Sequence, residues 1–224
     1  MLATDLEGRE ALAAAEGGVE KRRYVRRMFS EIAPSYDLLN HVLSFNVDRL
    51  WRRAALRELG WERRPAGTYL DLCAGTLDVG AQLLRSTGFA GHVVGADFAE
   101  PMLRAGAGKA PAGRLSPVTA DALELPLAPG SVAGAVVAFG IRNVADLDAC
   151  LREVLRVLEP GGRFVILEFS TPRSALVRFG YGLYSRRVLP AIGRLVSGHR
   201  TGYSYLPESI ARFPEAEALA VRMS

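Results

Sequence analysis

Residues 68–78 read TYLDLCAGTLD, an apolar run of strand length followed by a loop with a single glycine. More short apolar runs follow along the chain, and helical patterns separate them. This order is typical of a parallel sheet covered by helices on both faces, with strands buried on both sides. The expected strands are 68–73, 92–96, 115–119, 132–139 and 163–169. The expected helices between them are 78–86, 101–109 and 145–158.

The helix expected at 145–158 has recognisable ends. Asn143 is an N-cap candidate, and Pro160-Gly161-Gly162 is a stop signal. Two further helical segments flank the sheet pattern, at 20–59, broken near Pro34 and Asn46, and at 174–224. Neither reads as a separate domain.

The composition excludes several classes of protein. With 224 residues, 49% hydrophobic and 23% charged, the chain can bury a full core and is neither disordered nor fibrous. Its longest apolar run, 132–141, is about half the ~20 residues needed to cross a bilayer, so we expect a cytoplasmic protein. Cys73 and Cys150 have no spacing for zinc or a disulfide framework and are interpreted as small buried hydrophobic residues. The arginines are dispersed, which gives no reason to expect nucleic acid as a partner.

The loop after the first strand is the place to look for a ligand, because ligands of doubly wound sheets bind beyond the carboxyl ends of the strands. It lacks the Gly-x-Gly-x-x-Gly pattern of dinucleotide-binding loops. Instead it has an acidic residue at its start, Asp71, one glycine, Gly75, and a hydroxyl, Thr76. This combination favours a ligand with an amino acid end over one with phosphates.

Acidic residues also follow the second and third strands. Asp97 can accept hydrogen bonds from both hydroxyls of a ribose, and Phe98 can cover an adenine face. Asp121, followed by Ala122, can receive the adenine amino group. Each acid alone is more readily explained as a helix cap or a solvated charge. Three acids at successive strand exits favour a nucleoside site.

From about residue 24 to residue 213 the chain resembles the ubiquinone/menaquinone biosynthesis C-methyltransferases, a branch of the class I S-adenosylmethionine-dependent methyltransferases. The shared elements are Tyr36-Asp37-x-x-Asn40 with Ser44 and Arg49-x-Trp51, the loop at 71–76, Phe139-Gly140-Ile141-Arg142-Asn143-Val144, and Leu158-Glu159-Pro160-Gly161-Gly162-Arg163 leading to Leu167-Glu168-Phe169-Ser170. The resemblance implies a Rossmann-like α/β fold, a doubly wound and mostly parallel sheet with helical additions at both ends. It implies S-adenosyl-L-methionine as cofactor, contacted by Thr76, Asp97, Asp121 and Ala122, and no metal.

The resemblance also implies a division of the single domain. Residues 1–66 form a helical N-terminal cap, 67–170 the cofactor-binding core and 171–224 a helical segment on the substrate and membrane side. The substrate implied is a demethylated quinol with a long isoprenoid tail, and the reaction is C-methylation of a demethylmenaquinol in menaquinone biosynthesis. Three alternatives remain: a ubiquinone-precursor benzoquinol as substrate, a non-catalytic scaffold of quinone synthesis, and a nicotinamide-dependent oxidoreductase, against which the missing glycine pattern counts.

Methylation at carbon requires a ring that has lost a phenolic proton, and the exit of the fourth strand is the expected place for this step. Arg142 can stabilise a phenolate and orient a water, and Asn143 can hydrogen-bond the ring oxygens. Ala138, at the same exit, is an expected cofactor contact. The alternative is structural: Asn143 caps the next helix and Arg142 pairs with Asp146.

A second group of polar residues precedes the sheet. Tyr36, the third expected catalytic residue, shares a helix face with Asp37 and Asn40. These side chains form either a polar wall of the pocket or a local hydrogen-bond cluster. His41 and His199 are minor candidates for the base and are more readily explained as structural.

The chain departs from the family pattern at two places. The family has Gly-Thr-Gly-Asp in the first loop, where this chain has Gly75-Thr76-Leu77-Asp78. A positive φ at Leu77 would cost roughly 1–2 kcal/mol. The chain also stops at Ser224, where the family continues with the last two strands, so we expect those strands to be missing and the sheet edge to be open.

Residues 176–196 mix aromatic and aliphatic side chains with four arginines. Such a segment can lie at a membrane interface, which predicts peripheral contact with the inner face of the cell membrane. A lid over the pocket, a subunit interface as in a homodimer, and ordinary core packing are the alternatives.

Overall fold

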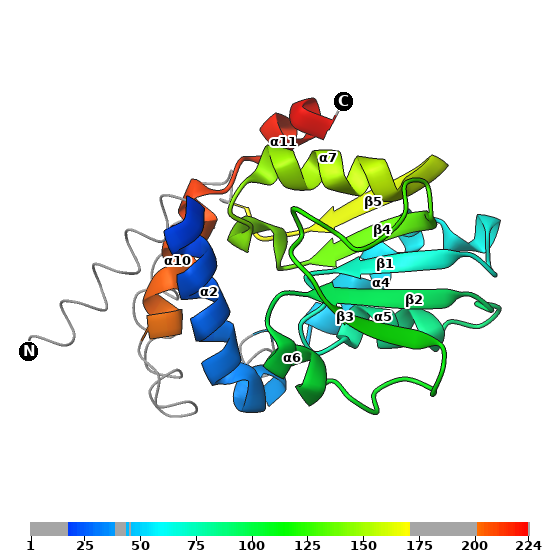
Figure 1. The fold of residues 1–224 in the computed structure, drawn as a ribbon, viewed down its shortest axis with the longest axis horizontal. Coiled ribbons are helices and arrows are strands. Elements are labelled where there is room, and N and C mark those ends of the chain that lie inside the picture. The colour runs from blue at the N-terminus through cyan, green and yellow to red at the C-terminus, as the bar shows by residue number, and fades with distance from the viewer. Residues whose placement is uncertain (1–17, 39–43, 45, 171–200, 224) are drawn as a thin grey trace, which may run out of the picture.

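The structure, a computed structural model, describes residues 18–38, 44, 46–170 and 201–223. Its centre is a sheet of five parallel strands in the order β3-β2-β1-β4-β5 (Figure 1). The strands are β1 (Thr68–Leu72), β2 (His92–Asp97), β3 (Leu115–Thr119), β4 (Val132–Ala138) and β5 (Leu158–Leu167). The predicted doubly wound parallel sheet is confirmed, and β5 forms an edge of the described sheet.

Helices precede, connect and follow the strands. They are α2 (Gly18–Ile32), η1 (Ala33–Ser35), α4 (Asp48–Leu59), η2 (Trp61–Arg63), α5 (Asp78–Leu84), α6 (Glu100–Ala105), η3 (Ile141–Asn143), α7 (Leu147–Val157), α10 (Thr201–Arg212) and α11 (Ala216–Met223). The expected breaks in the N-terminal helical segment are present, since η1 contains Pro34 and Asn46 has a positive φ of 61°. Among the described residues, no helix is both long enough and apolar enough to span a bilayer.

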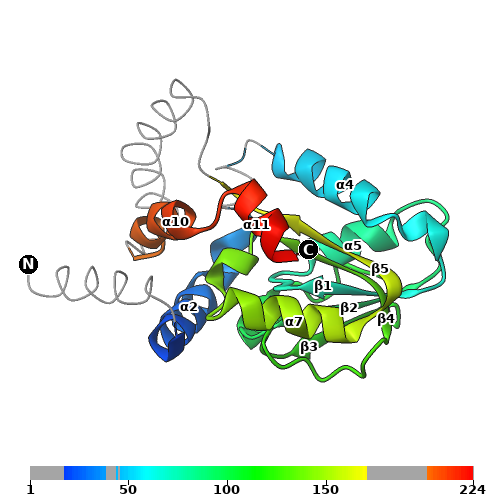
Figure 2. The same ribbon diagram turned by 90° about the horizontal axis from the view of Figure 1, so that it is seen from above.

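Two apolar layers enclose the sheet because side chains alternate along each strand. Leu70 and Leu72 of β1 pack toward α7, in a cluster with Cys150 and Val154. Tyr69 points to the opposite face, where α4 and α5 cover the sheet in a second cluster. Figure 2 shows α4 and α5 on one side of the sheet and α7 on the other.

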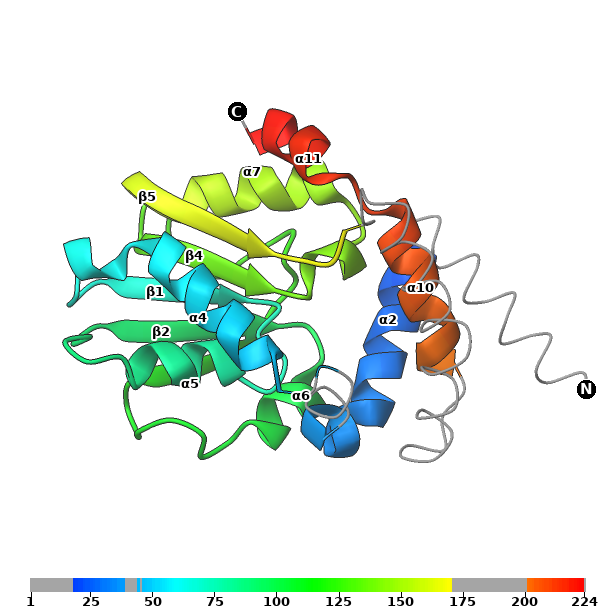
Figure 3. The same ribbon diagram turned by 180° about the vertical axis from the view of Figure 1, so that it is seen from behind.

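The helices α2 and α10 lie side by side across the carboxyl ends of the strands, as Figures 1 and 3 agree. The rings of Tyr24 and Tyr205 join them, with 5.5 Å between centroids. The helices α2 and α10 therefore close the end of the sheet where the strand exits meet.

The structure corrects both expected ends of the helix at 145–158. Its N-cap is Asp146, whose Oδ1 accepts a hydrogen bond from the amide of Ala149 at 2.9 Å, and not Asn143. Asn143 ends η3, and Val144 is extended, so the chain leaves one helical turn before it enters the next. At the other end, Leu158 already pairs with Val132, so β5 begins before Pro160 and not at 163.

Candidate functional site

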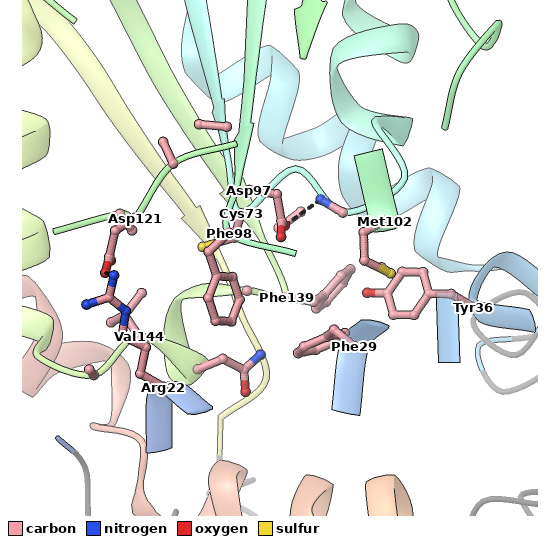
Figure 4. Close-up of a pocket in the computed structure, with 18 residues that line it drawn as sticks. Arg22, Phe29, Tyr36, Cys73, Asp97, Phe98, Met102, Asp121, Phe139 and Val144 are labelled. Carbon is pink, nitrogen blue, oxygen red and sulfur yellow. Dashed lines mark hydrogen bonds and ion pairs between the residues drawn. The ribbon is translucent and has the colours of Figure 1, made fainter. Parts of the chain in front are cut away.

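A pocket lies at the carboxyl ends of the strands, where strand order reverses between β1 and β4 (Figure 4). Its walls come from α2, from the residue that follows η1, from α6, and from the loops after β1, β2, β3 and β4. Eight of the predicted site residues line it: Tyr36, Gly75, Asp97, Phe98, Asp121, Ala122, Ala138 and Asn143. These eight residues therefore lie around one pocket, while Asp71, Thr76 and Arg142 lie outside its lining.

The loop after β1 approaches the pocket in an unusual backbone conformation. Cys73, Gly75 and Leu77 have φ values of 52°, 53° and 64°, in the left-handed region. Leu77 therefore has the positive φ that would cost roughly 1–2 kcal/mol. Its side chain is 3% exposed and fills the space beside Gly95, where an added Cβ would lie 2.5 Å from Leu77 Cδ2. The burial of this leucine offsets the backbone strain.

Asp97 is the central acid of the pocket. Its Oδ2 accepts a hydrogen bond from the amide of Gly75 and its Oδ1 one from the amide of Ala99, both at 2.8 Å. Burial raises the pKa of this carboxyl, although these amides oppose the shift. Each carboxylate oxygen can accept more than one hydrogen bond, so the group can hold the loop after β1 and still receive ligand hydroxyls.

Asp121 lies at one end of the pocket, beyond β3 (Figure 4). Arg22 of α2 pairs with it, with 2.8 Å between Nη2 and Oδ2, and its Oδ1 accepts from the amide of Leu123. The other end of the pocket is apolar: Phe139, Phe29 and Tyr36 lie there. The pocket thus has a charged end and an aromatic end.

Asn143 lies in the wall formed by η3 and is 8% exposed. Among the described residues, its Oδ1 is one of the buried side-chain atoms without a hydrogen-bond partner. A buried acceptor without a partner is costly unless a ligand or water satisfies it. Since Asn143 lines the pocket, a bound ligand could donate the hydrogen bond that its Oδ1 lacks.

Thr76 faces away from the pocket lining and is 2% exposed. Its hydroxyl donates to Asp37, and Lys109 bridges Asp37 and Asp78 at 2.5 and 2.7 Å. Burial opposes ionisation of Asp78, but the hydrogen bond from Lys109 and the charge of Arg52 lower its pKa. The Tyr36–Asp37 element therefore fastens the N-terminal helices to the loop after β1. Asn40 and His41 lie outside the described residues, as do His199 and residues 176–196.

Asp71 lies in β1 and binds the first turn of α5. The N-cap of α5 is Leu77, which has no side-chain acceptor, and Asp71 Oδ2 instead accepts from the amide of Gly80 at 2.8 Å. This carboxylate replaces the missing cap for one amide of the first turn. Burial raises its pKa to about 7.

The raised pKa of Asp71 predicts a pH dependence of stability. The unfolded chain loses this proton near pH 4 and the folded chain only near pH 7, so the free energy of unfolding falls as pH rises through this window. The effect of this one group is at most about 4 kcal/mol. Urea unfolding at pH 5 and pH 8 should show that Asp71→Asn, which cannot ionise, gains stability over the wild type at the higher pH. Asp148→Asn, at an exposed acid, should show no such gain, and an equal difference at both pH values for Asp71→Asn would contradict the prediction.

Arg142 is buried beside the pocket and not in its lining. It pairs with Glu168, at 2.6 Å between Nη1 and Oε1, and the two side chains are 8% and 3% exposed. The alternative prediction that Arg142 pairs with Asp146 is wrong, because the Asp146 carboxylate caps α7. Arg142 also donates to the carbonyl of Phe139 and to Ser209 of α10, which places it between β4, β5 and α10.

Several residues that line the pocket were not predicted from the sequence. Arg22 and Phe29 are contributed by α2, and their helical pattern gives no sign that they reach strand exits far along the chain. Cys73 is partly buried, since it packs against the apolar core and also lines the pocket, whereas Cys150 is fully buried as predicted. Phe139 belongs to the motif at 139–144, and its position in the pocket depends on a φ of 61° that no sequence pattern signals.

Comparisons with known proteins identify the family of this chain. The chain matches the ubiE/COQ5 methyltransferase family over residues 18–224. A demethylmenaquinone methyltransferase of Thermus thermophilus is 48% identical over 199 residues, covering 88% of this chain and 89% of that protein. The ubiquinone/menaquinone biosynthesis C-methyltransferase UbiE of Geobacter sulfurreducens is 46% identical over 209 residues, covering 92% of this chain and 80% of that protein.

The fold has counterparts among solved structures. A protein of Thermotoga maritima, described as an S-adenosylmethionine-dependent methyltransferase and possible histamine N-methyltransferase, superposes with a TM-score of 0.58 at 20% identity. The match covers 88% of this chain and 78% of that one. At this identity the likeness shows the fold alone. The comparisons lend no support to the oxidoreductase or the non-catalytic scaffold.

Proposed function

Because this chain belongs to the ubiE/COQ5 methyltransferase family, we propose that it is the S-adenosyl-L-methionine-dependent C-methyltransferase that converts a demethylmenaquinol to menaquinol. The observation that carries the proposal is the buried carboxylate of Asp97, held by the Gly75 amide at the strand exits. The names of the relatives support quinone biosynthesis as the setting, and some of them name ubiquinone as well.

The residues of the pocket fit this cofactor. Asp97 would receive the ribose hydroxyls, with Phe98 against the adenine and Asp121 near its amino group. Gly75 brings backbone close to the pocket, and a Cβ there would lie 3.4 Å from Met102 Cε. When bound, S-adenosyl-L-methionine supplies an electrophilic methyl group on a sulfonium.

The protein's part in the reaction is to position and desolvate the acceptor ring. The side-chain oxygen of Asn143, which has no partner in the described part of the chain, would accept a hydrogen bond from a phenolic hydroxyl of the quinol. Tyr36 lines the same pocket and is our second candidate for contact with that ring. Arg142 would act through them as a positioning residue, because its guanidinium is already bound to Glu168 and to the Phe139 carbonyl.

A quinol with a long apolar tail partitions into lipid, so we also propose that the enzyme contacts the inner face of the cell membrane. Residues 176–196 are the expected contact, and they lie outside the described residues. Flotation of the protein with anionic lipid vesicles tests this contact, and a protein that stays at the bottom of the gradient would exclude it.

Labelled S-adenosylmethionine tests the reaction. We expect purified enzyme to transfer the labelled methyl group to the unsubstituted ring carbon of a reduced, short-chain demethylmenaquinone. The same assay with a prenylated methoxybenzoquinol asks whether the ubiquinone-type ring is also accepted. A protein that binds S-adenosylhomocysteine but labels neither ring would contradict the proposed function.

A further inference from the structure

Three aromatic side chains form a continuous cluster from the pocket to the protein surface. The rings of Phe139 and Phe169 are stacked, with 4.7 Å between centroids and 26° between planes. Trp51 meets both rings edge-on, at 6.1 Å from Phe139 and 6.2 Å from Phe169. The three residues come from α4 and from the chain just after β4 and β5. We call them the aromatic cluster.

Phe139 forms the inner end of the aromatic cluster. It lines the pocket near Phe29 and Tyr36 (Figure 4). The ring of Phe169 stacks on the ring of Phe139. A φ of 61° is rare for a bulky residue, and such strain persists only where the surroundings hold it. Here the Phe139 amide donates to the carbonyl of Leu167 at 2.8 Å, and its own carbonyl accepts from Arg142. The protein thus maintains a strained backbone that keeps an aromatic ring in the pocket wall.

Trp51 forms the outer end of the aromatic cluster. It lies in the first turns of α4 and is 39% exposed, so one part of its indole contacts the two phenylalanines and another meets solvent. At the opposite end of the pocket, the ion pair of Arg22 with Asp121 would disfavour an apolar group. An apolar chain attached to a ring in the pocket is therefore better accommodated at the end where the aromatic cluster lies.

We propose that the aromatic cluster is the acceptor subsite: the quinol ring packs against Phe139 from the pocket side, and its apolar tail leaves over Trp51 to the surface. This inference rests on the proposed function, because it takes a tailed quinol as the acceptor. It adds a specificity role for Trp51 and Phe169, which recognise the tail and contribute little to the binding of the cofactor.

Two acceptors that share a ring test the proposal: 1,4-naphthoquinol without a chain and 2-geranyl-1,4-naphthoquinol. Trp51→Ala should raise the KM for the geranyl compound at least ten-fold and the KM for the chainless compound less than three-fold. The Kd for S-adenosylhomocysteine should stay within two-fold of the wild type. Leu155→Ala, at an exposed leucine of α7 that is 72% accessible, is the matched control and should change neither KM.

Phe169→Leu provides a second test if Trp51→Ala does not fold. It should also raise the KM for the geranyl compound more than the KM for the chainless compound, by a smaller factor than Trp51→Ala. Equal KM changes for both acceptors in these variants, or none, would overturn the subsite while the wild-type activity still supports the proposed function. If the wild type methylates neither naphthoquinol, the proposed function fails and the subsite fails with it. Thermal melts of each variant separate a loss of folding from a loss of recognition.

Discussion

Replacing Arg142 with alanine is expected to lower the free energy of unfolding by about 3–5 kcal/mol. The change leaves the Glu168 carboxylate, which is 3% exposed, without the guanidinium that neutralises it. The amides of Arg142 and Phe169 still donate to this carboxylate, but two neutral donors do not replace a cation. The hydrogen bonds to the Phe139 carbonyl and to Ser209 of α10 are lost as well. Urea unfolding at neutral pH measures the change.

An exposed ion pair gives the matched control. Arg104 pairs with Glu100 at 2.6 Å, but the two side chains are 78% and 54% exposed, so Arg104→Ala should cost less than about 1 kcal/mol. The double variant Arg142→Met with Glu168→Leu should recover much of the stability, because it removes both buried charges together. If Arg142→Ala costs no more than Arg104→Ala, the buried pair does not hold this end of the sheet together.

Most of the sheet was predictable because the apolar composition of a buried strand is visible in a short stretch of sequence. The central strands β1, β2 and β4 are nearly fully buried, as expected, and β1 and β4 each end one residue earlier than expected. The edge strand β3 coincides with the expected 115–119 but is only partly buried, so the expectation of burial on both faces is wrong there. The start of β5 was not predictable, since Pro160-Gly161-Gly162 is a stop signal in isolation. Here the pairing of Leu158 with Val132 continues the sheet through it, and the register shifts before the next pair, Gly134 with Arg163, because β5 has extra residues there. Tertiary pairing overrides the local signal.

The site was predictable only where sequence position fixes spatial position. Acids at the ends of neighbouring parallel strands must meet at one edge, and Asp97 and Asp121 both line the pocket. Asp71 lies within β1, one residue before the end of the strand, and its carboxylate accepts a hydrogen bond from the first turn of α5. Residue type alone did not indicate this contact with the helix. The same holds for Arg142, whose partner Glu168 is 26 residues away on another strand exit. Pairings between distant segments depend on packing, which no local pattern reports.

Asp97→Asn is expected to weaken the binding of S-adenosylhomocysteine at least 100-fold. Each hydrogen bond to a charged group contributes about 1.5–3 kcal/mol, and a ribose offers two hydroxyls to this carboxylate. The substitution also gives one of the two amides that Asp97 binds, Gly75 or Ala99, a donor in place of an acceptor. Isothermal titration calorimetry at neutral pH measures the affinity. Glu100→Gln, at an exposed acid three residues along, is the control and should bind as the wild type does.

The pH dependence of binding distinguishes a lost charge from a damaged loop. Burial raises the pKa of Asp97, and only the ionised form can accept from both hydroxyls with full strength. The affinity of the wild type should therefore fall on acidification at a higher pH than an ordinary carboxylate would require, whereas Asp97→Asn should bind weakly at every pH. If the variant binds within about three-fold of the wild type, Asp97 does not hold the ribose. If its weaker binding follows the same pH profile as the wild type, another group sets that profile, and Asp97 contributes only through the Gly75 loop.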